Sequence, residues 1–81
     1  MSIQYEPVNT QSAALQIAEQ IQQSITDGTL KANDKLPTEE ELARQFNVSR
    51  PTIREALKRL AAKSLIRSRR GPTGGTFVNR P

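Results

Sequence analysis

Apolar side chains recur at helical spacing in three separate stretches of the chain. In the first stretch, alanine and isoleucine positions repeat at three- and four-residue steps: Ala14, Ile17, Ala18, Ile21 and Ile25. Such a period predicts an amphipathic helix with one buried stripe. Ser12 is a suitable N-cap, and Asp27-Gly28 ends the helix because glycine readily adopts the left-handed turn that follows many helices.

The polar residues before this helix have no apolar period. We therefore expect an extended N-terminal arm over residues 1–12 and one folded domain over residues 13–81. After the first helix, residues 29–36 hold turn-forming residues around Asn33, and a short extended piece is expected near Leu36.

The second helical stretch opens at Pro37-Thr38. Thr38 and Glu41, three residues later, form a capping-box sequence, in which each side chain accepts a hydrogen bond from the other residue's backbone N–H. Three consecutive glutamates in the first turn complement the positive end of the helix dipole. The buried side of this helix is apolar and consists of Leu42, Ala43 and Phe46.

A tight turn separates the second helix from the third. Asn47-Val48 breaks the second helix because asparagine tolerates the left-handed conformation. Ser49 caps the third helix, and Pro51 lies in its first turn, where a missing N–H does no harm. The helix runs to about Lys63, and its apolar positions, which must face a core, are Ile53, Ala56, Leu57 and Leu60.

Two short extended runs, LIRSR at 65–69 and TFV at 76–78, flank a loop rich in glycine and proline and predict a β-hairpin. A hairpin directly after two helices joined by a tight turn is the order of a winged helix-turn-helix. The predicted fold class is therefore mainly α with a small β-hairpin, with three helices plus a two- or three-stranded antiparallel wing sheet.

Composition limits the chemistry that this fold can carry. The chain has 81 residues, enough for one small domain, and it contains no Cys and no His. Without a phosphate-binding Gly-Lys motif or a spaced carboxylate cluster, we expect no catalytic site, no metal and no cofactor in this chain. The sequence shows no signal peptide and no long apolar run, so a soluble, cytoplasmic protein without a membrane partner is expected.

The net charge of +4 is distributed unevenly. Residues 1–40 carry two basic and six acidic side chains, a formal charge of −4, whereas residues 41–81 carry ten basic and two acidic side chains, a formal charge of +8. A half with this imbalance repels itself unless a polyanion relieves it, and nucleic acid is the usual one. A merely solubilising surface would intersperse both signs.

The exposed side of the third helix is the first candidate site. In a helix-turn-helix this helix enters the DNA major groove with its N-terminal residues at the base edges. The candidates are Ser49, Arg50, Pro51, Thr52, Arg54 and Lys58. Arginine matches guanine with two hydrogen bonds, and the hydroxyls of Ser49 and Thr52 can reach phosphate. Glu55 is placed to pair with Arg59 one turn later. An ordinary solvated helix face is the alternative, which the capped turn and the basic half disfavour.

The hairpin tip is the second candidate site, through Arg69, Arg70 and Gly71. Glycine lets a backbone approach a groove closely, and narrow A·T-rich minor grooves attract arginine. For the glycines alone an ordinary turn is the simpler interpretation, but the two arginines beside them favour nucleic acid.

The stretches DKLPTEEELA, VSRPTIREALKRL and GGTFV, in this order and spacing, resemble the winged helix-turn-helix of the GntR family of bacterial transcription regulators over about residues 15–78. The GPTGG spacer resembles the FadR-like, or FCD, branch. The resemblance implies that Arg50 and Arg54 read guanines, that Ser49 and Thr52 occupy phosphate or base-edge positions, and that Gly71 enters the minor groove.

The family pattern also places Thr38 and Glu40 at the DNA. The family usually begins its second helix with Ser-Glu-Arg-Glu, so Glu40 stands where an arginine is expected and predicts a changed or weaker operator preference. Asn33 and Ser64 stand at customary glycines. Asparagine also adopts left-handed turns, whereas Ser64 predicts a different or strained turn.

Members of this family are homodimers that bind short inverted-repeat operators in double-stranded DNA, and a C-terminal domain binds a metabolite. We therefore expect the DNA-binding fragment of a longer metabolite-responsive repressor, although a natural stand-alone domain is an alternative. We expect a homodimer in the full-length protein or on DNA. One small core uses most of the apolar residues, so the isolated domain should be mostly monomeric. The functional alternative is a winged helix for protein–protein contact or non-specific DNA binding.

Overall fold

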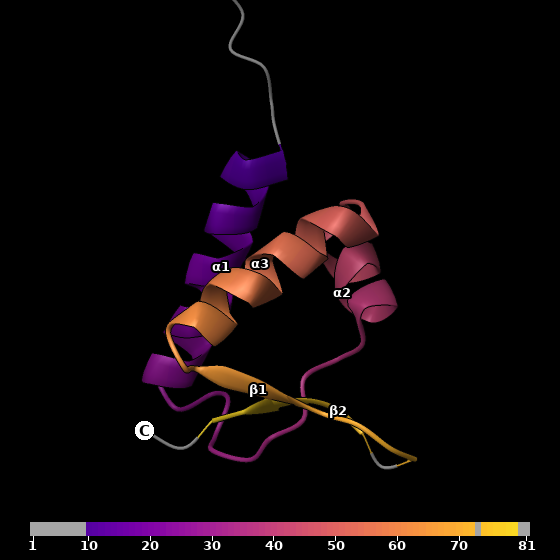
Figure 1. Ribbon diagram of the computed structural model, residues 1–81. Coiled ribbons are helices and arrows are strands. Elements are labelled where there is room, and N and C mark those ends of the chain that lie inside the picture. The colour runs from indigo at the N-terminus through magenta and orange to yellow at the C-terminus, as the bar shows by residue number, and fades with distance from the viewer. Residues whose placement is uncertain (1–9, 73, 80–81) are drawn as a thin grey trace, which may run out of the picture.

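The computed structural model describes residues 10–72 and 74–79. Its elements, in chain order, are α1 (Thr10–Thr26), α2 (Glu39–Phe46), α3 (Arg50–Ala62), β1 (Ile66–Arg69) and β2 (Gly75–Val78). Figure 1 shows α1 crossing behind α3, with α2 beside the start of α3 and the hairpin below both. This arrangement is the predicted winged helix-turn-helix.

Helix α1 begins earlier than predicted. Its first residue is Thr10, so Ser12 lies inside the first turn and is not the N-cap. Residues 1–9 of the predicted N-terminal arm lie outside the described residues. The apolar stripe of α1 is buried as expected except at its last position, Ile25, which is partly buried. Gly28, with φ of +87°, makes the left-handed turn after the helix.

The core draws on every helix and on both strands of the described part. Helix α3 packs most extensively against α1 and also contacts α2 and β1. The largest side chains without solvent exposure are Ile53, Leu60 and Val78, from α3 and β2. The other buried apolar residues are Ala14, Ile17, Ala18, Ile21, Leu36, Leu42, Ala43, Ala56 and Ile66. Burying one face of α3 in this core fixes which of its side chains remain exposed.

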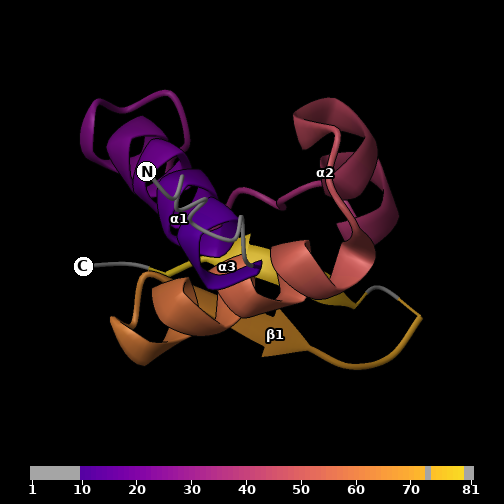
Figure 2. The same cartoon turned by 90° about the horizontal axis from the view of Figure 1, so that it is seen from above.

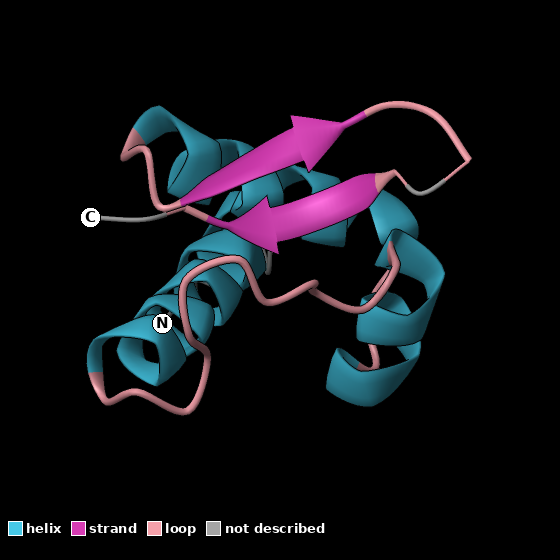
Figure 3. Cartoon of the chain, turned by 90° about the horizontal axis from the view of Figure 1, so that it is seen from below, coloured by secondary structure: helices cyan, strands magenta, loops and turns pink. Residues whose placement is uncertain are grey.

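The two strands pair antiparallel, with Ile66 opposite Val78 and Ser68 opposite Thr76. The segment before α2 adds a third, bridge-length edge, since Lys35 pairs with Phe77 and the Leu36 N–H donates to the Thr76 carbonyl at 2.8 Å. Figure 3 shows this segment running beside β2. The extended piece predicted near Leu36 is therefore part of the wing sheet.

Arg67 fastens the same segment to the hairpin. Its guanidinium donates to the carbonyl of Val78 at 3.3 Å, to the side chain of Asn79 at 3.1 Å and to the side chain of Asn33 at 3.1 Å. Asn33 has φ of +71°, the left-handed conformation that was expected at this position. The partners of Arg67 lie 11, 12 and 34 positions away from it in the sequence. The three bonds therefore hold the loop at Asn33 against the hairpin.

The turn between α3 and β1 places a serine where glycine would be unstrained. Ser64 has φ of +60°, which confirms the prediction of strain. The turn is well bonded: the Leu65 N–H donates to the Leu60 carbonyl at 3.0 Å, and Asn79 donates from its side chain to the Ser64 carbonyl at 3.1 Å. Tertiary bonding therefore holds Ser64 in a conformation that serine disfavours.

Replacing Ser64 with glycine should stabilise the fold. Relief of left-handed strain exceeds the added entropy of an unfolded glycine, so Ser64→Gly should raise the unfolding free energy by about 0.5–1 kcal/mol. The midpoint of thermal unfolding, followed by circular dichroism, should rise by about 2–8 °C. The control is Ser24→Gly inside α1, which should lower the midpoint because glycine weakens helix interiors. An unchanged or lower midpoint for Ser64→Gly would contradict the strain.

Candidate nucleic-acid interface

The start of α2, the start of α3 and the hairpin tip lie toward one end of the molecule (Figures 1 and 2). Each carries candidate side chains from the sequence. A hydrogen-bonded cap starts α2, and a tight turn joins α2 to α3.

The predicted capping box at the start of α2 is formed. The Glu41 N–H donates to the Thr38 hydroxyl at 3.1 Å, and the Thr38 N–H donates to the Glu41 carboxylate at 3.2 Å. The backbone bond from Thr38, followed by the Thr38 side chain, lowers the pKa of the Glu41 carboxyl below its ordinary value. Thr38 is exposed and is the N-cap of α2.

The turn between α2 and α3 sets the angle of the third helix. Asn47 adopts the predicted left-handed conformation, with φ of +57° and ψ of +48°. The Val48 N–H donates a hydrogen bond to the Ala43 carbonyl at 3.0 Å. Val48 is partly buried against the core. Ser49 then occupies the N-cap position of α3 with extended backbone.

Two predictions for this cap are wrong. The Ser49 side chain makes no capping bond to the helix; its hydroxyl lies 2.9 Å from the Thr52 hydroxyl instead. Thr52 is only 5% exposed, so it is not free to reach phosphate as predicted. Its position at the edge of the apolar stripe turns it into the core, and the exposed Ser49 satisfies its hydroxyl. Ser49 therefore remains an exposed candidate residue, while Thr52 is buried beneath it.

The other predicted residues of α3 are exposed: Arg50, Pro51, Arg54 and Lys58. Arg54 makes an ion pair that the sequence reasoning missed, because its Nη2 lies 3.3 Å from Oε1 of Glu39 at the start of α2. The Arg54 side chain is 60% exposed and that of Glu39 is 32% exposed. The pair restricts where the guanidinium points while leaving it accessible.

Glu55 pairs with a different residue from the one predicted. Its carboxylate lies 3.5 Å from the Lys58 ammonium, one turn away, and no pair with Arg59 is found in the described part of the chain. Arg59 is half-buried, and its Nε lies in the interior without a hydrogen-bond partner among the described residues. Because Arg59 is packed partly into the interior, it does not form the predicted ion pair with Glu55 on the helix surface.

The hairpin tip presents Arg69, Arg70 and Gly71 to solvent, as predicted. The Arg69 guanidinium lies over the Phe77 ring, 5.6 Å from its centre, a cation–π contact that holds this side chain along the sheet. Gly71 has φ of +108°, and its carbonyl accepts from the Gly74 N–H at 2.9 Å. A methyl group at Gly74 would collide with the carbonyls of Arg69 and Gly71, so glycine is required there.

Glu40 is exposed at the first turn of α2. Its two neighbours are occupied, Glu39 by Arg54 and Glu41 by the capping box. Glu40 has no hydrogen bond or ion pair with the residues that the structure describes. It is thus the carboxylate at this end of α2 that is available to meet another molecule.

A crevice of about 200 Å³ separates α3 from the hairpin. Its α3 side carries Arg54, Leu57 and Lys58, and its hairpin side carries Ser68 and Thr76. The sequence reasoning named neither hydroxyl residue. The period of two along each strand, together with the pairing register, would have placed both on the same sheet face as buried Ile66 and Val78.

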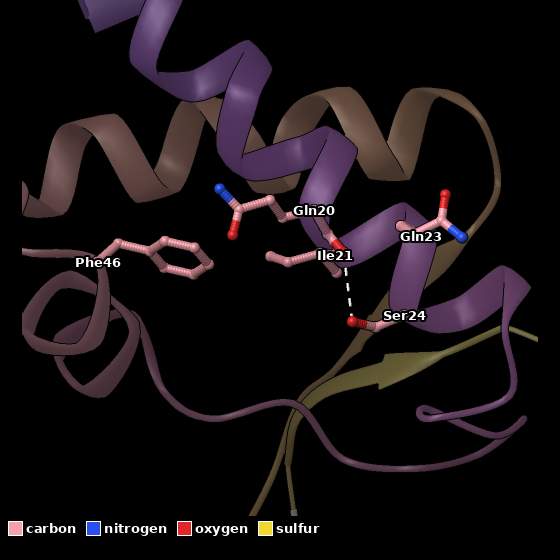
Figure 4. A pocket seen from close by; sticks show the side chains of 5 residues that line it. All are labelled: Gln20, Ile21, Gln23, Ser24 and Phe46. Atoms are coloured by element: carbon pink, nitrogen blue, oxygen red, sulfur yellow. Dashed lines mark hydrogen bonds between the residues drawn. The ribbon is translucent and has the colours of Figure 1, made fainter.

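A pocket of about 290 Å³ between α1 and α2 differs in character. Figure 4 shows Phe46 pointing across it toward Ile21 and Gln20, and the Ser24 hydroxyl bonded back to the Gln20 carbonyl. No ionisable side chain lines this pocket. Across the described residues, no cluster of three metal-ligating side chains occurs, and no helix is both long and apolar enough to cross a membrane.

Comparison with known proteins places this geometry in a family. The model of bacterial regulatory proteins of the gntR family matches residues 13–78. The chain belongs to the GntR family. Membership confirms the resemblance found in the sequence. Because the members of this family are transcription regulators, it also confirms the expectation that the chain is not an enzyme. The FCD branch stays a prediction.

Two curated relatives show how much of a regulator this GntR chain matches. The HTH-type transcriptional regulator YcbG of Bacillus subtilis is 42% identical over 77 residues, which cover 95% of this chain and 32% of the relative. The mannosyl-D-glycerate transport/metabolism system repressor MngR of Escherichia coli is 44% identical over 63 residues, which cover 78% of this chain and 25% of the relative. The GntR chain thus spans about a quarter to a third of the length of these relatives.

A solved structure has the same fold. The crystal structure of AraR(DBD) in complex with the operator ORX1 superposes with a TM-score of 0.76 at 34% identity, covering 96% of this chain and 95% of that one. The agreement extends over nearly the whole GntR chain and supports the winged helix-turn-helix assignment.

The lowered pKa of Glu41 predicts acid sensitivity. A carboxyl whose pKa is depressed on folding stabilises the fold above its ordinary value of 4.5, and this contribution is lost as the pH falls through the lowered pKa. The unfolding free energy, measured by urea titration at several pH values, should therefore decline below about pH 4.5. Glu41→Gln should flatten part of this decline.

The control for this titration is Glu19→Gln, which removes an exposed carboxylate in the middle of α1, away from both helix ends and from the capping box. It should leave the acid decline as in the wild type. Equal slopes for the wild type and Glu41→Gln below pH 4.5 would show that the capping box contributes no pH-dependent stability.

Proposed function

We propose that this chain is the sequence-specific, double-stranded DNA-binding part of a transcription regulator, and that it acts as a repressor module. The observation that carries the proposal is the pair of exposed arginines, Arg50 and Arg54, on the first turns of a helix whose opposite face is locked into the core. A wing bearing Arg69 and Arg70 lies at the same end of the molecule. Both elements carry the charge and donors that DNA grooves attract.

The helix and the wing have different tasks in this proposal. The start of α3 enters the major groove, where Arg50 and Arg54 donate to guanine O6 and N7. The wing tip at Gly71 approaches the minor groove, where its open backbone offers no steric barrier. Ser49, Pro51, Lys58 and Thr38 lie at the edges of this surface and contact the phosphate backbone or sugar.

Glu39 gives Arg54 a defined starting position. The 3.3 Å ion pair keeps the long side chain from sampling many rotamers, so less entropy is lost when it meets a base. Both partners are partly exposed, and the guanidinium has five donors, so it can bind guanine while retaining one contact to Glu39.

The relatives support a regulatory role. AraR(DBD) was crystallised with an operator, and MngR is described as a repressor. We extend this to the chain: two copies bind an inverted-repeat operator in the bacterial cytoplasm, and a metabolite-binding domain of a longer protein controls them. No cofactor enters this scheme for the DNA-binding part.

Selection of bound sequences from a random pool of duplexes tests the proposal. Repeated cycles with the purified chain should enrich a short motif containing G·C pairs at fixed positions, arranged as an inverted repeat. Enrichment of no sequence would favour the alternative, a winged helix that binds DNA without specificity. No retention of any duplex at low salt would favour a protein–protein module.

Removing either base-reading arginine should lower both the affinity for DNA and the sequence specificity. Arg50→Ala and Arg54→Ala should each lose about 1–3 kcal/mol of binding free energy on the selected duplex, and each should relax specificity at one position. Fluorescence anisotropy with the selected and a scrambled duplex measures both effects. Lys31→Ala, on the loop after α1, is the control and should bind like the wild type. If affinity falls equally on the selected and the scrambled duplex, the arginines contact phosphates and do not read bases.

Glu40 should oppose DNA binding through its charge. A carboxylate near phosphates is repelled, so Glu40→Arg should tighten binding to every duplex and steepen the dependence of affinity on salt by about one charge. Glu40→Gln should produce an intermediate gain. Weaker binding by Glu40→Arg, confined to the selected duplex, would instead indicate that Glu40 accepts a hydrogen bond from a cytosine.

A further inference from the structure

The crevice between α3 and the hairpin is lined by three cationic side chains, Arg54, Lys58 and Arg67, and by two hydroxyls. In the proposed function Arg54 reads a base, and the other groups of the crevice take no part in base reading. Lys58 stands on its α3 wall, and Ser68 and Thr76 face it from the hairpin. Leu57 and Ile66 also line the crevice. A flexible cation and two hydroxyl donors suit a small anionic group better than an apolar ligand.

The two hydroxyls are placed as a pair. Ser68 and Thr76 are direct partners in the antiparallel register, so their side chains leave the same sheet face side by side. Neither hydroxyl makes a hydrogen bond within the described part of the chain. Lys58 is equally available, since its side chain is 71% exposed and its bond to Glu55 is a 3.5 Å surface pair.

The other charged groups at the crevice are already occupied. Arg67 directs its guanidinium to Asn33, Val78 and Asn79, and Glu39 is neutralised by Arg54. Lys58 is therefore the cation at the crevice whose ammonium can turn toward an anion, since its pair with Glu55 is an exposed surface pair at 3.5 Å. An anion entering here would not meet an unpaired carboxylate.

Duplex geometry identifies the anion. The major and minor grooves of DNA are separated by one sugar–phosphate strand, so a protein with one element in each groove must straddle that strand. In the proposed function α3 occupies the major groove and the wing tip the adjacent minor groove. The crevice lies between these two elements, and the strand between the grooves passes across it.

We propose that this crevice is a phosphate seat: Lys58, Ser68 and Thr76 bind one phosphodiester of the strand that separates the two occupied grooves. Lys58 supplies charge, and the two hydroxyls donate to the non-bridging oxygens. The seat sets the depth and register of α3 without reading sequence. This inference rests on the proposed function, because it requires duplex DNA as the ligand.

Side-chain changes in the seat should weaken binding without changing sequence preference. Ser68→Ala and Thr76→Val should each reduce affinity about three- to tenfold, and equally on the selected duplex and on a mixed-sequence duplex. Lys58→Met should also lower the salt dependence of affinity by about one charge. Matched controls remote from the crevice are Ser24→Ala, Thr29→Val and Lys31→Met, which should bind like the wild type. Circular dichroism melts verify that each variant is folded.

Duplexes with a single neutral methylphosphonate locate the seat. Wild-type affinity should fall when one particular phosphate per binding site is replaced. That same replacement should cost little further affinity in Lys58→Met or in the double variant Ser68→Ala/Thr76→Val, because the contact is already lost. Losses that add fully at every phosphate, or unchanged affinity for both hydroxyl variants, would overturn the seat.

The two proposals fail in different ways. If the chain binds duplexes but selection enriches no sequence, sequence-specific regulation fails, and the seat is still decided on the mixed-sequence duplex. If a motif is enriched while the seat variants bind like the wild type, the seat alone fails. If the wild type binds no duplex, both fail.

Discussion

The fixed orientation of α3 is the constraint on which the interface depends. One side of this helix, through Ile53, Ala56 and Leu60, is buried against α1 and the hairpin, and this burial provides most of the force that holds it. A helix so anchored cannot rotate without exposing those side chains. Arg50, Arg54 and Lys58 are therefore presented on a rigid support, which is what recognition of fixed donor and acceptor positions requires.

Electrostatics at the same surface are more balanced than the formal charge of the basic half implies. The first turn of α2 brings three glutamates to the end of the molecule where the arginines gather. Two of them are engaged, Glu39 with Arg54 and Glu41 with Thr38. One carboxylate thus orders Arg54 and another caps α2, and of the three glutamates only Glu40 makes no hydrogen bond or ion pair with the described residues.

Features encoded within a few residues could be predicted from the sequence. The capping box, the left-handed Asn47 and Gly28, and the strained Ser64 all follow from local spacing or from one residue type in a turn. Helix periods likewise predicted the buried stripes. The start of α1 was misjudged because Ser12 satisfies the N-cap preference, yet residues two positions earlier are already helical.

Features that depend on tertiary packing could not be predicted in this way. Arg54 and Glu39 are 15 positions apart and meet only because α2 and α3 cross. Thr52 lies on the boundary of the apolar stripe, where packing decides between core and surface. Glu55 has two possible partners within one turn, and the half-burial of Arg59 leaves Lys58 as the one it meets.

The hydrogen bonds of Asn79 hold the hairpin in a fixed position relative to α3. This residue, directly after β2, bonds through its backbone N–H to Leu65 at 2.8 Å and through its side chain to Ser64 at 3.1 Å, so the far end of the hairpin is fastened to the end of α3. Helix and wing consequently form one body whose two projecting ends keep a constant separation. If the helix and the wing enter adjacent grooves as proposed, this constant separation selects the spacing of those grooves, and DNA that is overtwisted, bent or stiffened away from that spacing is disfavoured even where every contacted base is unchanged.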